Sequence, residues 1–353
     1  MVMNTNDFVN KLDELFETTV KSSMIHECTM HIENKKGDFN WSKGYGGRSI
    51  DSIFNLASVT KLFTTTCIIN LVQKGELSLN DKLSKYFGRE LLDGLHRYKG
   101  KEYSDKITIE NLLFQNTGFP DVFAVGKNNL NKRIRQGDFC MSFEDYVDIA
   151  RENKKKFPPG TIGKAHYSDL NFEMLGKIIE QVEKLSLHDA YKKNIFIPLG
   201  LHNTYLMENE NDDCADVFYK DKALHLPNLW RSIPASGGCM GTSKEIMIFL
   251  KAFFGGELFD KSIFEQLKKF AMIQYAPPLG QYGGGFMKLN ISGIASFYRL
   301  KGEMIGHMGG SGSFAYYYPE KDIYLVGDVN QFAKPGLIFT IPLKIAKLAN
   351  RYL

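Results

Sequence analysis

Apolar residues follow a helical spacing near the N-terminus, and strand-like runs come directly after it. A first helix is predicted to end near Ser23, because apolar positions recur every three or four residues before that point: Phe8, Leu12, Leu15, Phe16 and Val20. Two β-prone runs follow at residues 27–33 and 39–45, and a polar turn containing Gly37 separates them. A turn of this kind between two such runs predicts a β-hairpin.

The middle of the chain has a mostly helical pattern. One helix is predicted from residue 58 to about residue 74, with Gly75 as its C-terminal stop. Four further helices are predicted at residues 108–113, 142–149, 170–182 and 243–254, and three of them have expected capping residues, Thr108, Ser142 and Ser243. The central segment is therefore expected to form a helical unit.

After residue 281 the pattern returns to β-structure. The β-prone runs lie at residues 282–287, 294–300, 313–318 and 323–328, and a final helix is predicted at residues 337–351. The predicted fold class is α/β of the α+β type: an antiparallel sheet built from both ends of the chain, flanked by N- and C-terminal helices, with an inserted mostly helical domain. Residues 1–55 and 281–353 are assigned to a discontinuous sheet domain and residues 56–280 to the helical domain, with the active site at their junction.

The composition is that of a globular protein and excludes several classes. The chain has 44 basic and 40 acidic residues, and its basic clusters are short and scattered, so nucleic acid is not expected as a partner. Its five cysteines are odd in number and far apart, without a Cys-x-x-Cys pair. This pattern argues against a disulfide framework and a zinc site, and it favours a reducing compartment. No metal and no cofactor are expected.

The chain shows no sign of a membrane segment. No stretch approaches the roughly 18 apolar residues that a spanning helix needs, and the N-terminus lacks a signal-peptide pattern. We therefore expect no membrane partner and a cytoplasmic location. An exported form whose leader has been removed remains open.

Ser58 is the only serine of the chain with a lysine three residues later, and it lies where a predicted helix begins. On a helix, residues three apart share a face, so the Lys61 amine would reach the Ser58 hydroxyl and accept its proton. This is a nucleophile with its base beside it. A chain of this composition contains roughly one Ser-x-x-Lys by chance, so the pair needs support from other segments.

Two later segments carry groups that a serine nucleophile needs. Tyr167 lies between a Pro-Gly turn and a helix start and is followed by Asp169, whereas two other Tyr-x-Asp matches fall in a charged loop and within a helical pattern. Residues 305–314, which include His307, are rich in glycine, so the backbone there can approach a ligand and direct amides at a developing oxyanion. The Gly-x-Gly in this segment is not a dinucleotide motif, because a β-prone run follows it rather than a helix.

In their order and spacing, these three motifs resemble the serine β-lactamase and penicillin-binding-protein superfamily. The likeness is greatest to its class C-like branch, which includes β-lactamase-related esterases and D-aminopeptidases. It extends to the segments at residues 52–57, 74–81, 107–120, 198–201 and 236–238. The resemblance implies that Ser58 forms an acyl-enzyme and that Lys61 and Tyr167 are its proton-transfer pair. It also implies that the backbone amides of Ser58 and Gly310 hold the oxyanion.

Further substrate-binding positions are implied at His307, Gly309 and Asp169. We expect cations such as Lys61 to favour the phenolate of Tyr167. Asp169 stands where asparagine is more usual, and we expect it to bond Lys61, keep it charged and shift base duty to Tyr167. No glutamate can be assigned the deacylating role that one has in class A enzymes.

The third motif departs from the β-lactam-hydrolysing pattern. His307 stands where lysine is usual, and an imidazole with a nominal pKa of about 6.5 is charged only when a neighbour raises that pKa. Met308 stands where a hydroxyl residue is common. The expected substrate is therefore a small-molecule ester, amide or D-amino-acid-containing compound, with weak or absent β-lactamase activity.

Two alternatives remain: a non-catalytic, penicillin-sensor-like binding protein, and a D-Ala-D-Ala carboxypeptidase or β-lactamase. The oligomeric state and a lid formed by residues 121–138 are also left open.

Overall fold

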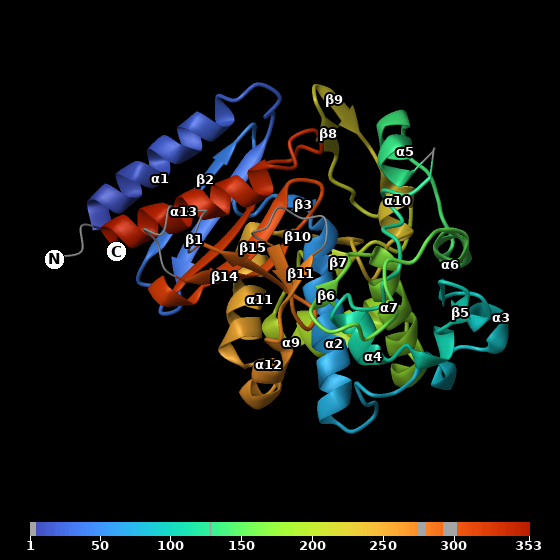
Figure 1. Cartoon of the computed structure of the whole chain (residues 1–353). Helices are drawn as coiled ribbons and strands as arrows, with labels where there is room; N and C mark the ends of the chain where they lie inside the picture. The colour runs from blue at the N-terminus through green and yellow to red at the C-terminus, as the bar shows by residue number, and fades with distance from the viewer. Residues whose placement is uncertain (1–4, 127–128, 274–279, 292–301) are drawn as a thin grey trace.

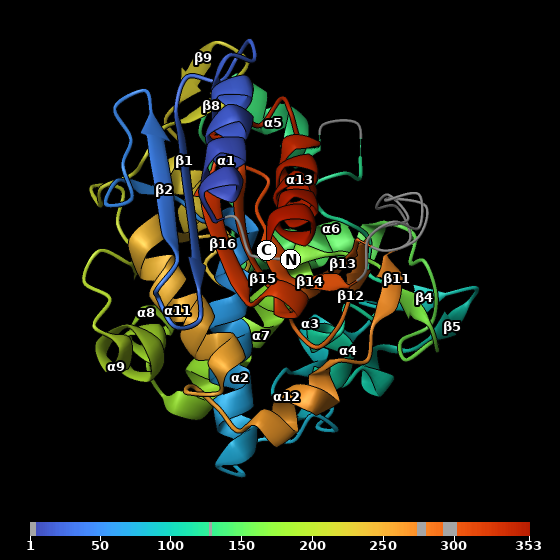
Figure 2. The same cartoon turned by 90° about the vertical axis from the view of Figure 1, so that its left-hand side faces the viewer.

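The computed structural model describes residues 5–126, 129–273, 280–291 and 302–353. Its centre is a nine-stranded sheet with helices on both faces (Figures 1 and 2). The terminal helices α1 (Thr5–Val20) and α13 (Leu337–Tyr352) lie side by side on one face, and α11 (Ser243–Gly255) packs on the other. Both terminal helices were predicted and are confirmed.

The large sheet is assembled from both ends of the chain. Its strands, in spatial order, are β2 (Asn40–Tyr45), β1 (Cys28–Asn34), β16 (Ile323–Asp328), β15 (Ser313–Tyr318), β14 (Glu303–Met308), β13 (Met287–Asn290), β12 (Gly280–Tyr282), β11 (Ala271–Ile273) and β6 (Lys164–Ala165). All neighbours pair antiparallel except β11 and β6. The runs predicted at 27–33, 39–45, 313–318 and 323–328 are confirmed, and the run at 294–300 lies outside the described residues.

The single strand predicted at residues 282–287 is wrong, because a glycine turn divides it. The Gly283 amide donates to the Phe286 carbonyl at 2.9 Å, which closes the turn between β12 and β13. Gly285 has a φ of +89°, and a Cβ there would lie 2.1 Å from the Thr65 hydroxyl oxygen. Only glycine fits this conformation and this approach.

The predicted helices of the central segment are confirmed. They are α2 (Lys61–Gln73), α4 (Ile109–Leu113), α6 (Phe143–Glu152), α7 (Asp169–Glu183) and α11. One cap differs from the prediction: Thr242 rather than Ser243 caps α11, since the Thr242 hydroxyl accepts from the Glu245 amide at 3.2 Å. Ser243 is the first residue of the helix, and its hydroxyl donates instead to the Ile50 carbonyl.

Short elements complete the chain. The further helices are α3 (Arg89–Leu92), α5 (Leu130–Gln136), α8 (Leu187–Tyr191), α9 (Ile197–Leu199), α10 (Pro227–Arg231) and α12 (Lys261–Leu267). A small sheet joins β3 (Ile53–Asn55), β10 (Cys239–Thr242) and β7 (Tyr205–Leu206), and two hairpins are formed by β4 (Arg97–Tyr98) with β5 (Lys101–Glu102) and by β8 (Val217–Tyr219) with β9 (Lys222–Leu224).

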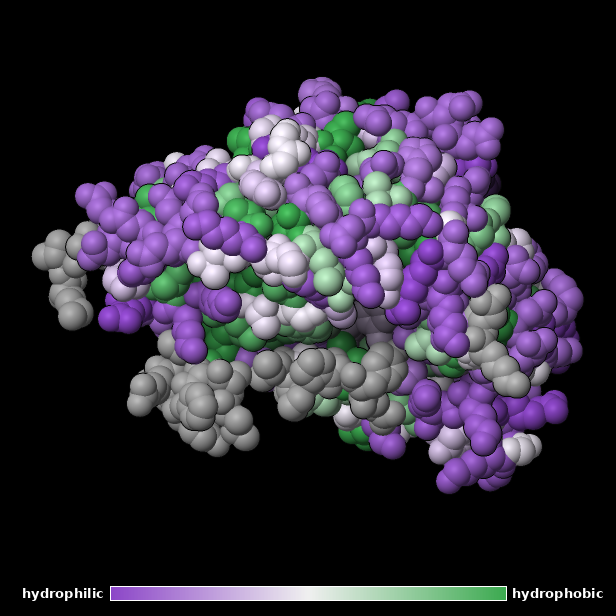
Figure 3. Space-filling model, turned by 90° about the horizontal axis from the view of Figure 1, so that it is seen from above, coloured by the Kyte–Doolittle hydropathy of each residue, from purple (hydrophilic) through white to green (hydrophobic). Residues whose placement is uncertain are grey.

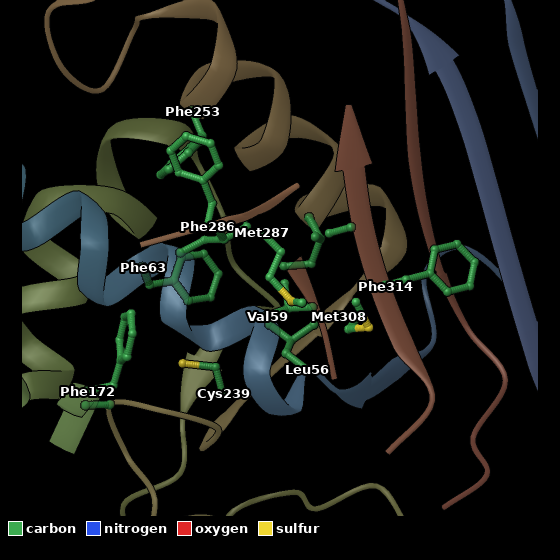
Figure 4. Close-up of a cluster of buried hydrophobic side chains, with 14 of the residues drawn as sticks. Leu56, Val59, Phe63, Phe172, Cys239, Phe253, Phe286, Met287, Met308 and Phe314 are labelled. Atoms are coloured by element: carbon green, nitrogen blue, oxygen red, sulfur yellow. The ribbon is translucent and has the colours of Figure 1, made fainter. Parts of the chain in front are cut away.

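Helix α2 is buried on almost every side, and its N-terminal end meets the large sheet. Figure 4 shows Leu56, Val59 and Phe63 packed with apolar side chains from α7, α11 and the sheet. Because Leu56 and Val59 are buried on either side of Ser58, the core fixes the position of that serine.

The division into two domains stays a prediction. Strands β6 and β11 come from the segment assigned to the helical domain, yet they join the large sheet, which α11 also covers. In the part of the chain that the structure describes, no helix has both the length and the apolar character that crossing a bilayer requires.

Candidate active site

Ser58 lies in a 3₁₀ turn (Ala57–Thr60) that runs directly into α2. The turn begins with strain, because Ala57 has a φ of +41°, a conformation that L-residues rarely adopt. The Asn55 side chain accepts from the Ala57 amide at 2.8 Å, and the Leu56 amide bonds the Cys239 carbonyl of the small sheet at 3.0 Å. These bonds hold the strained backbone that presents the serine.

Lys61 is fully buried, and its amine has three acceptors. Nζ lies 3.0 Å from Ser58 Oγ, 2.5 Å from Asp169 Oδ1 and 2.7 Å from the Ser236 carbonyl oxygen. The predicted contact with Asp169 is therefore present. An ammonium has three protons to donate, so these bonds describe a charged lysine in the resting site. Burial lowers the pKa of Lys61, and the Asp169 carboxylate partly offsets this effect.

Tyr167 comes from the loop before α7, and its hydroxyl donates to Ser58 Oγ at 2.8 Å. Burial raises the pKa of Tyr167 well above its usual value, and the charge of Asp169 raises it further. The expectation that Lys61 favours a phenolate is therefore wrong. The Lys61 charge is balanced by its ion pair with Asp169, so in the resting site Tyr167 is a neutral phenol that acts as a hydrogen-bond donor.

His307 is fully buried on β14, a strand that the glycine-rich pattern did not predict. Its Nε2 lies 3.3 Å from the Tyr282 hydroxyl, and its Nδ1 lies 3.0 Å from the Met308 amide nitrogen. Burial, together with the charge of Lys61, lowers the pKa of His307 to about 3. The imidazole is therefore neutral at physiological pH.

The turn between β14 and β15 is joined to the backbone just before Ser58. Ser313 Oγ donates to the Leu56 carbonyl at 2.7 Å, and Ser311 Oγ donates to the Asn55 carbonyl at 3.2 Å. Gly309 permits this approach, because a Cβ there would lie 2.6 Å from the Leu56 carbonyl oxygen. The glycine-rich motif thus positions the sheet against the segment that carries Ser58.

These motifs meet at a cavity of about 560 Å³. Ser58, Tyr167, Asp169, His307 and Gly310 all line it, so the structure brings the predicted residues together, while Lys61 lies beneath them. Much of the remaining wall is apolar and includes Phe123, Ile134, Leu229, Trp230, Ile233, Phe332, Pro335 and Phe339. In the surface seen from above, hydrophobic residues lie across the middle of the face, with hydrophilic residues above them and to their right (Figure 3).

Described residues of the segment 121–138, for which the question of a lid was left open, contribute one wall of this cavity. Asp121, Phe123, Asn131, Ile134 and Arg135 line it, the last three on α5. No cluster of His, Cys, Asp or Glu side chains suited to a metal ion occurs among the residues that the structure describes.

Two residues of this site were missed by the sequence analysis. Ser236 contributes a backbone carbonyl to Lys61, and Glu173 accepts hydrogen bonds from the Ala235 and Ser236 amides. Ser236 lies in the segment 236–238 to which the family resemblance extends, but that resemblance gave it no role. For Glu173 the available signal was its charge within the apolar run of α7, one turn after Asp169.

Comparison with known proteins identifies the family. A family model described as Beta-lactamase matches residues 34–347, which is most of the chain. The chain belongs to the beta-lactamase family. The superfamily predicted from the three motifs is thereby confirmed, and the class C-like branch stays a prediction.

Protein flp of Staphylococcus aureus (strain MRSA252) is 29% identical over 221 residues, which are 60% of this chain and 41% of that protein. The chain thus spans less than half the length of this curated relative.

Two solved structures share the fold across nearly the whole chain. The D-amino acid amidase of Ochrobactrum anthropi SV3, complexed with L-phenylalanine, has a TM-score of 0.76 at 18% identity and covers 98% of both chains. EstCE1, a hydrolase with promiscuous acyltransferase activity, has a TM-score of 0.78 at 17% identity and covers 99% of both. At these identities the likeness shows the fold, and the family is one of hydrolases.

Proposed function

We propose that this protein is a serine hydrolase that acts on esters or small amides through an acyl-enzyme formed on Ser58. One observation carries the proposal: Ser58 Oγ accepts hydrogen bonds from both Lys61 Nζ and the Tyr167 hydroxyl at the edge of the cavity. Two proton-carrying groups on one hydroxyl oxygen are the arrangement that nucleophilic catalysis by serine needs.

The lowered pKa of Lys61 supports it as the base, and the raised pKa of Tyr167 keeps it protonated, so that it has a proton to donate. Burial favours the neutral amine of Lys61, which is proposed to form when the ammonium loses one proton to water. The amine then accepts the Ser58 proton as Oγ attacks the substrate carbonyl. Tyr167 donates its proton to the leaving oxygen or nitrogen as that bond breaks, and Lys61 passes the proton taken from Ser58 to Tyr167, which restores the phenol.

In deacylation, water takes the place of the leaving group and the same transfers run in reverse. Tyr167 returns its proton to Lys61 and accepts one from the attacking water, and Ser58 Oγ regains a proton from Lys61 as the acyl bond breaks. The amides of Ser58 and Gly310 are proposed to hold the oxyanion in both steps, because both residues line the cavity.

The shape and charge of the cavity support uncharged substrates with a bulky apolar group. Its wall is largely aromatic and aliphatic, and the neutral His307 supplies no fixed charge for a carboxylate. Among the described lining residues, Arg135 is the one permanent cation, and it is exposed on α5. We therefore favour hydrophobic esters and small amides over β-lactams.

The test compares Ser58→Ala with the wild type and with Ser262→Ala, an exposed serine on α12. Turnover of a chromogenic ester should fall by about 10³-fold or more in Ser58→Ala, and mass spectrometry should show no fluorophosphonate adduct. Ser262→Ala should match the wild type. Undiminished labelling or turnover in Ser58→Ala would refute this function. A stable wild-type adduct without turnover would instead identify a sensor-like binding protein.

A further inference from the structure

Glu173 is a buried carboxyl group that the proposed acyl transfer does not use directly. It lies on α7 one turn after Asp169, and only 4% of its surface is exposed. A carboxyl group in such a place costs free energy unless hydrogen bonds satisfy it. Its partners are therefore informative.

Both oxygens of Glu173 accept backbone amides from one short segment. Oε1 accepts from the Ser236 amide at 3.0 Å, and Oε2 accepts from the Ala235 amide at 3.3 Å. The carbonyls of the same two residues face the other way, toward α2. The Ser236 carbonyl accepts from Lys61 Nζ at 2.7 Å, and the Ala235 carbonyl accepts from the Thr64 hydroxyl at 2.6 Å.

Residues 235–236 thus form a bridge between Glu173 on one helix and Lys61 on another. The packing keeps this bridge close to α7, because a Cβ on Gly176 would lie 2.6 Å from the Ala235 Cβ. A shift of the segment would therefore move the Ser236 carbonyl and change the set of acceptors around Lys61.

We propose that Glu173 is a positioning residue for acylation: by holding the amides of residues 235–236, it fixes the carbonyl that orients the Lys61 amine toward Ser58. This inference rests on the proposed function of the site. Glu173 does not touch the reacting atoms, so it acts only through this backbone segment and through its charge.

The surroundings of Glu173 make this role sensitive to pH. The titratable groups whose charges interact with it are Asp169 on the same helix, Lys61 on α2, Tyr146 on α6 and Tyr191 on α8. Burial raises the pKa of Glu173 to about 7, against the lowering effect of the hydrogen bonds from residues 235–236. The ionised form is the one that accepts both amides, and its fraction rises as the pH passes through neutrality.

The main test replaces the carboxylate by an amide of the same size, Glu173→Gln. The new side chain has one acceptor oxygen, so one of the two amides loses its partner. The second-order rate of acylation by a fluorophosphonate should fall by about tenfold to a hundredfold, while KM for an uncharged ester should change little. The wild-type acylation rate should rise between about pH 6 and pH 8 around a midpoint near 7, and this rise should be absent from Glu173→Gln.

Glu245→Gln is the matched control. Glu245 is also a buried glutamate, with 6% of its surface exposed, and it accepts from the amides of His202 and Asn203 at 2.9 Å. The Glu245→Gln variant should lose stability as Glu173→Gln does, but its acylation rate and the pH midpoint of that rate should stay those of the wild type. Thr64→Val removes the second anchor of residues 235–236, and it should lower the acylation rate while keeping the midpoint.

Unchanged acylation in folded Glu173→Gln would overturn the proposal, as would a midpoint near 7 that persists in that variant. Such a midpoint would point instead to Asp328, a second buried carboxyl group with a pKa raised by burial to about 7. If Glu173→Gln does not fold, an unchanged rate in Thr64→Val overturns the proposal. Loss of labelling in Ser58→Ala, combined with any of these results, leaves the proposed function intact, so the two failures are distinguishable.

Discussion

The helical side and the sheet side of the cavity contribute different kinds of chemical group. On the helical side, Lys61, Tyr167 and Asp169 contribute side chains, and a buried ion pair lies directly beneath Ser58. On the sheet side, His307 is neutral. Gly309 has no side chain, so the turn can approach the Leu56 carbonyl closely. The helical side positions groups that carry protons, and the sheet side positions the backbone just before Ser58.

This difference teaches that the two sides should fail in different ways. A substitution on the helical side removes a group proposed to carry a proton, so the acylation rate should fall by orders of magnitude, and stability should fall strongly only where a buried charge loses its partner. A substitution on the sheet side that disturbs the close contact of the turn with the Leu56 carbonyl should lower stability, and its effect on the acylation rate should be much smaller. The predictions below test this distinction, in decreasing order of effect.

The largest effect is expected from Lys61→Met. It should lower acylation by about 10³-fold or more, and it should also destabilise the fold by about 3–5 kcal/mol, because Asp169 is left as a buried charge without its cation. Fluorophosphonate labelling and urea unfolding measure the two losses. The double variant Lys61→Met/Asp169→Asn should recover most of the stability and none of the acylation. Recovery of acylation would remove Lys61 from the mechanism.

Tyr167→Phe should act on rate with little effect on stability. Removing the hydroxyl that donates to Ser58 Oγ should lower kcat by about 10²–10⁴-fold and the free energy of unfolding by only about 1 kcal/mol. The loss should be smaller for nitrophenyl esters than for alkyl esters, since a good leaving group needs no acid. Equal losses for both would contradict the role of Tyr167 as the acid.

On the sheet side, Gly309→Ala and Gly310→Ala form a matched pair. A Cβ on Gly309 would lie 2.2 Å from Ser313 Oγ, whereas a Cβ on Gly310 would lie 3.8 Å from its nearest neighbour, a ring atom of Phe332. Gly309→Ala should therefore cost about 1–3 kcal/mol and lower acylation by about tenfold. Gly310→Ala should be nearly neutral in thermal and urea unfolding. Equal stability of the two variants would contradict the close contact of the turn.

The smallest effect on catalysis is expected from the titration of His307. Because its folded pKa is about 3, the imidazole should not titrate between pH 7.5 and 9, and turnover of uncharged esters should change little there once tyrosine titration is separated. A loss of activity that follows imidazole deprotonation would contradict a neutral His307.

The same lowered pKa has a consequence for stability. Between pH 6.5 and 3 the unfolded chain binds a proton that the folded site does not, so this group destabilises the fold as the pH falls. At pH 5 the wild type should have lost about 2 kcal/mol through this residue relative to pH 7. His307→Gln should lack that share of the loss in urea unfolding. An equal loss of stability in both proteins would mean that a group other than His307 binds the proton on unfolding.

Much of the fold could be predicted because its main elements have local signatures. Strands β15 and β16 and helix α13 coincide with their apolar patterns to within a residue at each end. Strands β6 and β11 have two and three residues, too few to show a period, and they exist only because a partner strand lies beside them. The turn at Gly283 had a signal in three successive glycines, but the flanking tyrosine, phenylalanine and methionine all favour strands, and the run was therefore predicted as continuous.

The candidate site was predictable where chemistry resides in side chains at a fixed spacing. Ser58, Lys61 and Tyr167 have such a pattern, and the structure brings them into hydrogen-bond contact. Ser236 acts through its carbonyl, which has no sequence signature. The protonation of Tyr167 was mispredicted because it depends on burial and on how far Asp169 balances Lys61, and spacing reveals neither.

The hydrogen bonds around Ser58 also span great distances along the chain. Tyr167 meets Ser58 across 109 positions, and Ser313 meets Leu56 across 257. Contacts of this separation form only after large loops have closed, so the whole set requires most of the chain to be in place. The extent of covalent labelling of Ser58 would therefore measure the fraction of molecules that are native. Applied during refolding or heating, the labelling would measure how fast this set of contacts forms and how fast it is lost.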